Sequence, residues 1–237
     1  MDRVNIKCFC FNPFRENCYL LWGGSDDCVI VDPGCYEPSE VSALTGFISS
    51  KGLVPRAIWL THGHFDHIFG VAELSRKYSI PVYLSPLDGV TIGSNNDLTQ
   101  GFGLRRPDMS FETRELVEGQ ILRFAQDDNS PSFEVIPTPG HTPGCVCFYS
   151  EQAKILLSGD TLFAGSIGRT DVEGGDYDKE ILSIMDKLML LPGDVDVYPG
   201  HGPATSIAVE RTTNPFLQPF NEPFEGDTTE DNNEICI

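Results

Sequence analysis

Three of the five histidines in this chain lie within seven residues, in the segment THGHFDH at residues 61–67. The segment directly follows the apolar run AIWL at residues 57–60, which is typical of a buried strand. His62 and His64 are one residue apart, so one loop can direct both side chains at a single point. Asp66 and His67 continue the turn and can face a second point nearby. The chain must therefore fold so that a strand ends where several polar side chains gather.

The two remaining histidines also follow predicted strands. His141 ends the stretch FEVIPTPGH, and His201 ends the stretch DVDVYPGH. Asp160 ends a similar apolar run, KILLSGD. Because proline and glycine stop strand pairing and turn the chain, we expect each of these side chains on the rim of a sheet.

This set of residues predicts a metal site. A single histidine is more often an ordinary surface or core residue, but here the same local context would have to arise five times by coincidence. Imidazole and carboxylate groups, with no cysteine in these loops, suit zinc, iron or manganese. With Asp66 and Asp160 the five histidines make seven candidate ligands, too many for one tetrahedral ion. If Asp160 bridges, two divalent cations each receive four protein contacts; we expect zinc first, with iron or manganese as alternatives.

Short, apolar, β-branched segments recur along the chain and stop at Gly, Pro or Asp. They predict strands at residues 4–11, 18–23, 28–31, 57–60, 82–84, 121–124, 133–136, 145–149, 154–157 and 196–198. Helical patterns occur at residues 37–51, 68–78, 177–191 and 204–212. Since helices fall between groups of strands, we expect a mixed α/β fold with sheets covered by helices.

The pattern predicts one catalytic domain over residues 1–215. Within it, residues 88–110 (DGVTIGSNNDLTQGFGLRRPDMS) are rich in Gly, Asn and Asp and are interpreted as an inserted loop. Residues 216–237 are acidic with few apolar side chains, so we expect a mobile tail.

The formal net charge of −19 argues against nucleic acid or an anionic membrane surface as a partner. No apolar run has membrane-spanning length, and the N-terminus lacks the pattern of a secretory signal. The eight cysteines are expected as reduced, mostly buried thiols without a catalytic role. These features predict a cytoplasmic protein with a small-molecule substrate and leave its oligomeric state open.

The combined motif resembles that of the metallo-β-lactamase-fold hydrolases. The motif consists of an H-x-H-x-D-H segment followed by three later ligands. In this chain these residues are His62, His64, Asp66, His67, His141, Asp160 and His201. The resemblance covers nearly the whole chain and implies an αββα sandwich with the metal ions at one edge of two facing sheets. The ligands it implies for the first ion are His62, His64 and His141. Those it implies for the second ion are Asp66, His67 and His201.

Two carboxylates receive catalytic roles by this resemblance: Asp160 as the bridge and Asp66 as a route for the proton. Asp32, in CVIVDPG, matches an aspartate that supports the ligands from behind. Arg169, in GSIGRTD, either contacts a substrate carboxylate or forms a salt bridge that organises the loop of Asp171.

Residues 158–176 (SGDTLFAGSIGRTDVEGGD) are similar to the single-domain type II glyoxalases, which resemble hydroxyacylglutathione hydrolases. This similarity implies cleavage of a 2-hydroxyacyl thioester such as S-lactoylglutathione. β-Lactamases of the commonest class have a cysteine at the position of Asp160, so antibiotic hydrolysis is not expected. Longer glyoxalases bind glutathione through a C-terminal helical domain, and this chain ends before one, which leaves the thiol part open.

Three other functions stay open on the sequence. Persulfide dioxygenases share the fold, and a resemblance to them would imply a site for one iron ion at the positions of His62, His141 and Asp160. A lactone or other ester hydrolase of the same fold is the second alternative. A metal-stabilised binding module is the third, although the motif is typical of the open sites of catalysts.

Overall fold

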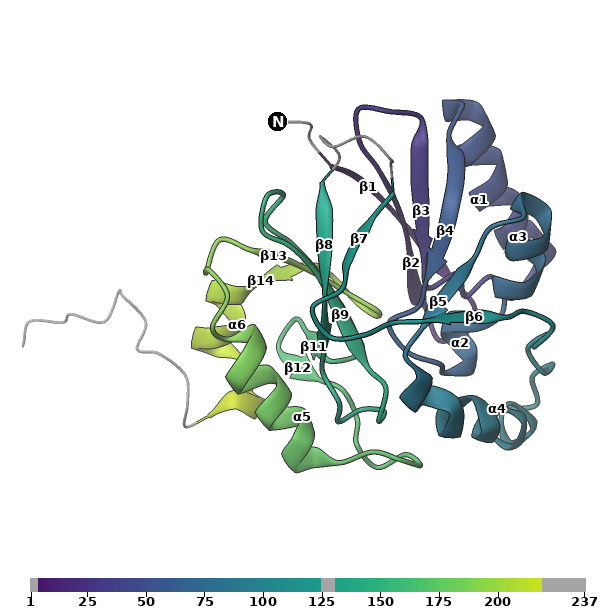
Figure 1. Ribbon diagram of the computed structural model, residues 1–237. Coiled ribbons are helices and arrows are strands. Elements are labelled where there is room, and N and C mark those ends of the chain that lie inside the picture. The colour runs from purple at the N-terminus through teal and green to yellow at the C-terminus, as the bar shows by residue number, and fades with distance from the viewer. Residues whose placement is uncertain (1–3, 125–130, 219–237) are drawn as a thin grey trace, which may run out of the picture.

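The computed structural model describes residues 4–124 and 131–218. Two six-stranded sheets face each other, and helices lie against the outer face of each sheet (Figure 1). The layers therefore run helices, sheet, sheet, helices. The predicted mixed α/β fold, an αββα sandwich, is confirmed.

The first sheet has its strands in chain order. Its first three strands are antiparallel, and the pairings from the third strand to the sixth are parallel. The strands are β1 (Asn5–Phe11), β2 (Glu16–Trp22), β3 (Asp27–Val31), β4 (Val54–Trp59), β5 (Val82–Leu84) and β6 (Thr113–Glu115).

The second sheet is antiparallel except for the parallel pairing of β10 with β13. Its strands, in spatial order, are β14 (Thr205–Ser206), β13 (Asp196–Pro199), β10 (Ile155–Gly159), β9 (Val146–Ser150), β8 (Ser132–Pro137) and β7 (Ile121–Arg123). A separate hairpin consists of β11 (Leu162–Phe163) and β12 (Ser166–Ile167).

The α-helices are α1 (Pro38–Lys51), α2 (Phe65–Ile68), α3 (Val71–Tyr78), α4 (Gly89–Gly101), α5 (Tyr177–Ser183) and α6 (Ile207–Thr213). Two short 3-10 turns are η1 (Pro86–Asp88) and η3 (Pro215–Leu217), and one π-helical turn, η2 (Ile184–Leu188), continues α5. α1 begins at a capping box between Glu37 and Glu40 and ends at Gly52, which has a φ of 68°. Glycine tolerates this left-handed conformation without a steric penalty.

The core between the sheets is aromatic at its centre. Trp59 of β4 lies 5.6 Å from the ring of Phe133 on β8 and 5.4 Å from that of Phe148 on β9, measured between ring centroids. Along β2, Tyr19 and Leu21 join this inner core, because alternate residues of a strand point to opposite faces. The two sheets are thus held together by apolar burial.

Separate apolar clusters attach the helices. α1 and α3 contribute Leu44 and Leu74 to a cluster on the outer face of the first sheet. η2 and α6 contribute Leu188 and Ile207 to a cluster on the outer face of the second. This packing leaves the ends of β4, β8, β10 and β13 to supply the loops that carry the candidate ligands.

The prediction of an inserted loop over residues 88–110 is wrong for most of that stretch, because residues 89–101 form the helix α4. The buried residues of α4 are Thr91, Asn95 and Thr99, at the four-residue spacing of one helical face. These side chains are polar, so a search for apolar periodicity misses the face that packs.

Other differences concern short elements. The helix predicted over residues 68–78 begins later, as α3 at Val71, and Ile68 ends the separate helix α2. Gly70 lies between the two helices, and a Cβ atom there would lie 2.8 Å from the carbonyl oxygen of Pro33. β6, β11, β12 and β14, each of two or three residues, were not predicted. Leu217, within the predicted tail of residues 216–237, is buried, and residues 219–237 lie outside the described part of the chain.

All seven cysteines in the described ranges are free thiols, and five of them are buried. Cys8 and Cys10 are exposed on β1, the edge strand of the first sheet. Within the same ranges, no helix has both the length and the apolar character needed to cross a membrane.

Candidate metal centre

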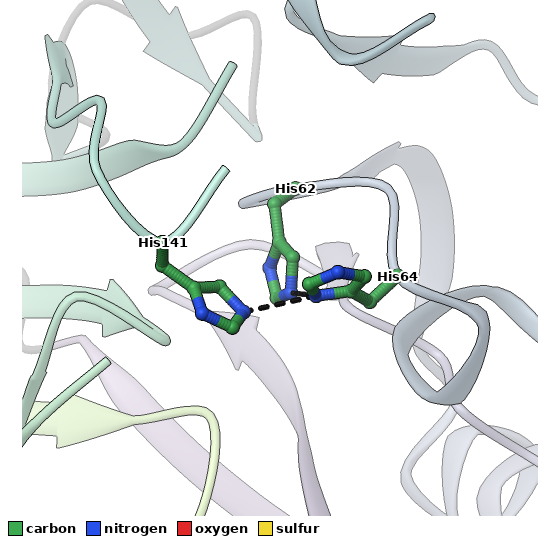
Figure 2. Close-up of side chains that lie close together, drawn as sticks. All are labelled: His62, His64 and His141. Carbon is green, nitrogen blue, oxygen red and sulfur yellow. Dashed lines mark hydrogen bonds between the residues drawn. The ribbon is translucent and has the colours of Figure 1, made fainter. Parts of the chain in front are cut away.

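The loop between β4 and α2 brings two histidines to one point. Nε2 of His62 lies 3.1 Å from Nδ1 of His64, and that atom lies 2.9 Å from Nε2 of His141, which follows β8. Figure 2 shows the three imidazoles, from two separate segments, with these nitrogens directed at one another. The three residues thus form a compact nitrogen cluster, which we call the His62 group.

Burial favours the neutral form of two histidines in this group, His62 and His64. His62, His64 and His141 are all buried. Burial and the neighbouring His141 lower the pKa of His64 to about 3, and burial likewise lowers the pKa of His62. A neutral imidazole keeps a lone pair, which is the form that binds a metal ion.

A second group consists of Asp66, His67 and His201. Nε2 of His201 lies 3.4 Å from Oδ2 of Asp66. Asp66 and His67 come from α2, and His201 follows β13. Each of the three can place one ligand atom within 4.8 Å of the others, which is compact enough to hold an ion.

Asp160, at the end of β10, lies between the two groups. Its Oδ2 atom is 3.6 Å from Nε2 of His141 and 3.5 Å from Nε2 of His201, and its Oδ1 atom is 3.4 Å from Nε2 of His67. Burial alone would raise the pKa of Asp160, but His67 and the other histidines hold that pKa well below its ordinary value. One carboxylate therefore faces members of both groups.

Two further observations fit a cation at this place. Nε2 of His67 and Oδ1 of Asp160 are buried, and neither has a hydrogen-bond partner among the described residues. Gly200 leaves space beside them, because a Cβ atom there would lie 2.2 Å from Oδ1 of Asp160 and 2.8 Å from Cε1 of His67. Buried polar atoms without partners are costly, and metal coordination would satisfy both.

Carbonyl oxygens orient two of the histidines. Nδ1 of His141 lies 2.7 Å from the carbonyl oxygen of Arg169, and Nδ1 of His201 lies 3.1 Å from that of Phe14. A carbonyl oxygen can only accept a hydrogen bond, so each Nδ1 carries the proton. Each Nε2 then presents its lone pair to the centre of the site.

Asp32 contacts the start of the histidine loop and one candidate ligand. Its carboxylate accepts hydrogen bonds from the backbone N–H and the hydroxyl of Thr61, at 2.8 and 2.7 Å, and lies 3.2 Å from Nδ1 of His67. Burial lowers the pKa of His67, but Asp160 and Asp32 outweigh it and raise that pKa well above its ordinary value. Asp32 thus ties the start of the histidine loop to one candidate ligand.

Arg169 binds Asp171 and not the candidate ligands. Its Nε and Nη2 atoms donate to the two carboxylate oxygens of Asp171 at 2.8 and 2.9 Å. The side chain is 64% exposed, and only the backbone carbonyl of Arg169 meets His141. Of the two roles considered from sequence, the salt bridge within the loop is the one for which the geometry provides contacts.

Sequence reasoning missed residues of α4 and η1 that hold the histidine loop. The buried carboxylate of Asp88 accepts from the backbone N–H of Gly63 and, at 2.9 Å, from that of Gly144. Nδ2 of Asn95 donates to the carbonyl oxygen of Gly63 at 2.7 Å. Asp88 therefore joins the loop of His62 and His64 to the loop of His141. No signal in the sequence marks it, because an acidic residue before a helix is common.

Glu180 of α5 was missed as well. It is fully buried, and its Oε2 atom accepts from the backbone N–H of His141 at 2.8 Å. Burial raises the pKa of Glu180 to about 8, although the N–H groups of His141 and Gly168 act in the opposite direction. Glu180 thus anchors the backbone of one candidate ligand from the helix layer.

A pocket of about 740 Å³ opens over the candidate ligands. Its lining includes five candidate ligands: His64, Asp66, His141, Asp160 and His201. Its remaining lining is Phe14, Phe65, Leu98, Phe102, Phe163, Ile167, Arg169, Asp171, Val172, Glu173 and Gly202. The site is therefore open to a small molecule.

Residues 11–201 match the family model of the metallo-beta-lactamase superfamily, so the chain belongs to that superfamily. Membership, with the clustered histidine and aspartate side chains, supports a metal-dependent hydrolase that acts on a small molecule. The resemblance inferred from sequence is confirmed.

Two curated relatives match nearly their full length. The chain is 38% identical to the probable metallo-hydrolase YqgX of Bacillus subtilis, over 88% of this chain and 95% of the relative. It is 35% identical to the hydroxyacylglutathione hydrolase GloC of Haemophilus influenzae, over 90% of this chain and 98% of the relative.

Two solved structures are similar at the level of fold and sequence. BLEG-1, a B3 metallo-beta-lactamase, superposes with a TM-score of 0.79 at 37% identity, over 90% of this chain and all of the other. TTHA1623 in a di-iron-bound form gives a TM-score of 0.78 at 38% identity, over 89% of this chain and all of the other.

Proposed function

We propose that this protein is a binuclear metal-dependent hydrolase that cleaves small 2-hydroxyacyl thioesters. The observation that carries the proposal is the position of Asp160, whose carboxylate faces the His62 group on one side and His67 and His201 on the other. The similarity to a protein named hydroxyacylglutathione hydrolase supports the thioester class.

The proposed ligands of the first ion are His62, His64 and His141. Those of the second are Asp66, His67 and His201, with Asp160 shared. The donor set of nitrogen and carboxylate oxygen suits zinc, and iron or manganese are alternatives. When bound, two divalent cations would supply Lewis acidity and would lower the pKa of a bound water molecule to about 7.

The residues of the chain account for the remaining steps. In the reaction the carbonyl carbon gains an oxygen from water, the carbon–sulfur bond breaks, and the products are a 2-hydroxy acid and a thiol. The carboxylate of Asp66 borders the pocket and is proposed to accept the proton that water releases. The leaving thiolate needs no strong acid, because the pKa of a simple thiol is only about 8.5.

The experiment follows thiol release from lactoyl thioesters, with and without air, after loading with zinc, iron or manganese. We expect release that is independent of oxygen and close to two equivalents of metal in the desalted protein. One equivalent, insensitive to loading, together with oxygen uptake on a persulfide and no thioester cleavage, would instead identify the mononuclear dioxygenase. Lactones and simple esters in the same panel test the ester hydrolase alternative.

A second candidate activity is β-lactam hydrolysis. The similarity to BLEG-1, a B3 metallo-beta-lactamase, favours it, even though Asp160 occupies the position where the commonest lactamase class has cysteine. Ring opening of a chromogenic cephalosporin measures this activity directly. The thioesterase assignment requires that kcat/KM for lactoyl thioesters exceed kcat/KM for the cephalosporin.

A further inference from the structure

One wall of the pocket is a cluster of three phenylalanines. The ring centroid of Phe14 lies 5.2 Å from that of Phe65 and 5.2 Å from that of Phe102, with the ring planes steeply inclined. Leu98, one turn before Phe102 on α4, extends this wall. Phe102 is 56% exposed, so apolar area on this wall is accessible to a ligand.

A second apolar wall comes from the β11–β12 hairpin and the loop that follows it. Phe163, Ile167 and Val172 line it, and the ring centroid of Phe163 lies 6.3 Å from that of His201. The candidate ligands thus share the pocket lining with two apolar surfaces. Such a pocket recognises a ligand mainly by removing apolar area from water.

The cationic side chain in the described lining of the pocket already forms a salt bridge. Arg169 is the one lysine or arginine among the described residues of the lining, and the carboxylate of Asp171 occupies two of its N–H groups. Glu173 adds a further exposed carboxylate beside it. Arg105 does not line the pocket: its guanidinium lies 4.4 Å from the ring centroid of Tyr36. The rim therefore has no uncommitted cation within the described lining.

We infer that the thiol part of the substrate is apolar and uncharged and lies against the wall of Phe14, Phe65, Leu98 and Phe102. The inference rests on the proposed thioesterase function and names the class of thiol. Glutathione carries two carboxylates and one ammonium group, and burying them beside Asp171 and Glu173 without a cation is costly. A neutral thiol with an aromatic or alkyl group meets no such cost and gains apolar burial.

The first test compares three substrates that share the lactoyl group. Their thiols are benzyl thiol, N-acetylcysteamine and glutathione. We expect kcat/KM for the benzyl thioester to exceed that for S-lactoylglutathione by at least about tenfold. Equal or higher kcat/KM for the glutathione thioester would overturn the inference and leave the thioesterase assignment intact.

A pair of phenylalanine variants tests the wall. Phe102→Ala is expected to lower the ratio of kcat/KM for the benzyl thioester to that for the N-acetylcysteamine thioester by about three- to tenfold. Phe216→Ala, an exposed phenylalanine in η3 that does not line the pocket, is the matched control and should leave the ratio unchanged. Equal effects of the two variants would refute the role of the wall.

A pair of charge variants tests the rim. Glu173→Lys places an unpaired cation beside the pocket, and we expect kcat/KM for S-lactoylglutathione relative to the benzyl thioester to rise about two- to fivefold. Glu151→Lys makes the same change of net charge at an exposed site outside the lining and should not alter the ratio. The inference fails if both variants raise it equally, since a general charge effect would then explain the preference.

Binding without turnover separates this inference from the proposed function. Calorimetry with the metal-loaded protein compares two unreactive thioethers, S-benzyl-N-acetylcysteamine and S-benzylglutathione. Tighter binding of the neutral thioether supports the inference even where no thioester is hydrolysed, and in that case the thioesterase proposal alone fails. Tighter binding of S-benzylglutathione, or no binding of either compound, overturns the inference.

Discussion

The carboxylate of Asp160 is shared by the two candidate metal positions. Asp160 is the only described residue whose carboxylate lies within 4.0 Å of histidines from both groups, and its Oδ1 atom is buried without a hydrogen-bond partner in the described structure. Replacing this carboxylate with an amide should therefore weaken metal binding at both positions.

We predict that Asp160→Asn lowers kcat about a hundredfold or more, which corresponds to at least about 2.7 kcal/mol of transition-state stabilisation. The metal content should fall from two equivalents to one or fewer, as measured by elemental analysis of the desalted protein. Asp196→Asn, an exposed residue on the neighbouring strand β13, is the control. Full activity of Asp160→Asn with two bound ions would show that its carboxylate does not bridge.

Residue type and local spacing are what allow candidate ligands to be named from sequence. All seven candidate ligands were identified from sequence, because histidine and aspartate at strand ends are recognisable one residue at a time. Asp88 and Glu180 were not, although both are fully buried and bind the backbone of the ligand loops. Their role depends on which N–H groups the fold brings near them, and composition does not record that.

At the scale of elements, α4 is the clearest case of a helix without an apolar pattern. Its buried face consists of Thr91, Asn95 and Thr99, and Asn95 donates a hydrogen bond to the carbonyl oxygen of Gly63 in the histidine loop. Asp88, just before α4, holds two ligand loops through N–H groups that would otherwise be buried without partners. The helix therefore supports the candidate metal centre directly.

We predict that Asp88→Ala destabilises the fold by about 2–5 kcal/mol, because each buried donor left without a partner costs about 1–3 kcal/mol. Metal affinity should fall in the same variant, since the loops of His62 and His141 lose their shared anchor. Urea unfolding and metal titration measure the two effects. Asp97→Ala, exposed on α4 itself, should change stability by no more than about 0.5 kcal/mol; similar losses in both variants would contradict the role of Asp88.

At the scale of the whole molecule, the site exists only because two sheets meet. The His62 group combines a loop from the end of β4 in the first sheet with one from the end of β8 in the second. Trp59, two residues before the histidine loop begins, packs against Phe133 and Phe148 across the interface between the sheets. The apolar core therefore fixes how closely the ligand loops approach.

We predict that Trp59→Ala lowers the free energy of unfolding by about 3–5 kcal/mol, the usual range for truncation of a buried tryptophan. Trp22→Ala, which removes the half-buried tryptophan at the end of β2, should cost clearly less. Urea unfolding followed by circular dichroism should show one transition for both variants. Two separate transitions would mean that the sheets do not unfold as one unit.

The sequence by itself determined the periodic strands, the positions of the candidate ligands at their ends, and the superfamily, because these depend on residue type and local spacing. Only the tertiary structure decided that residues 89–101 form a helix and that Arg169 pairs with Asp171. It also decided that two apolar surfaces border the pocket, since Phe14, Phe102 and Phe163 come from distant segments. Contacts between segments far apart in the chain are set by how the sheets and helices pack, and no local pattern encodes them.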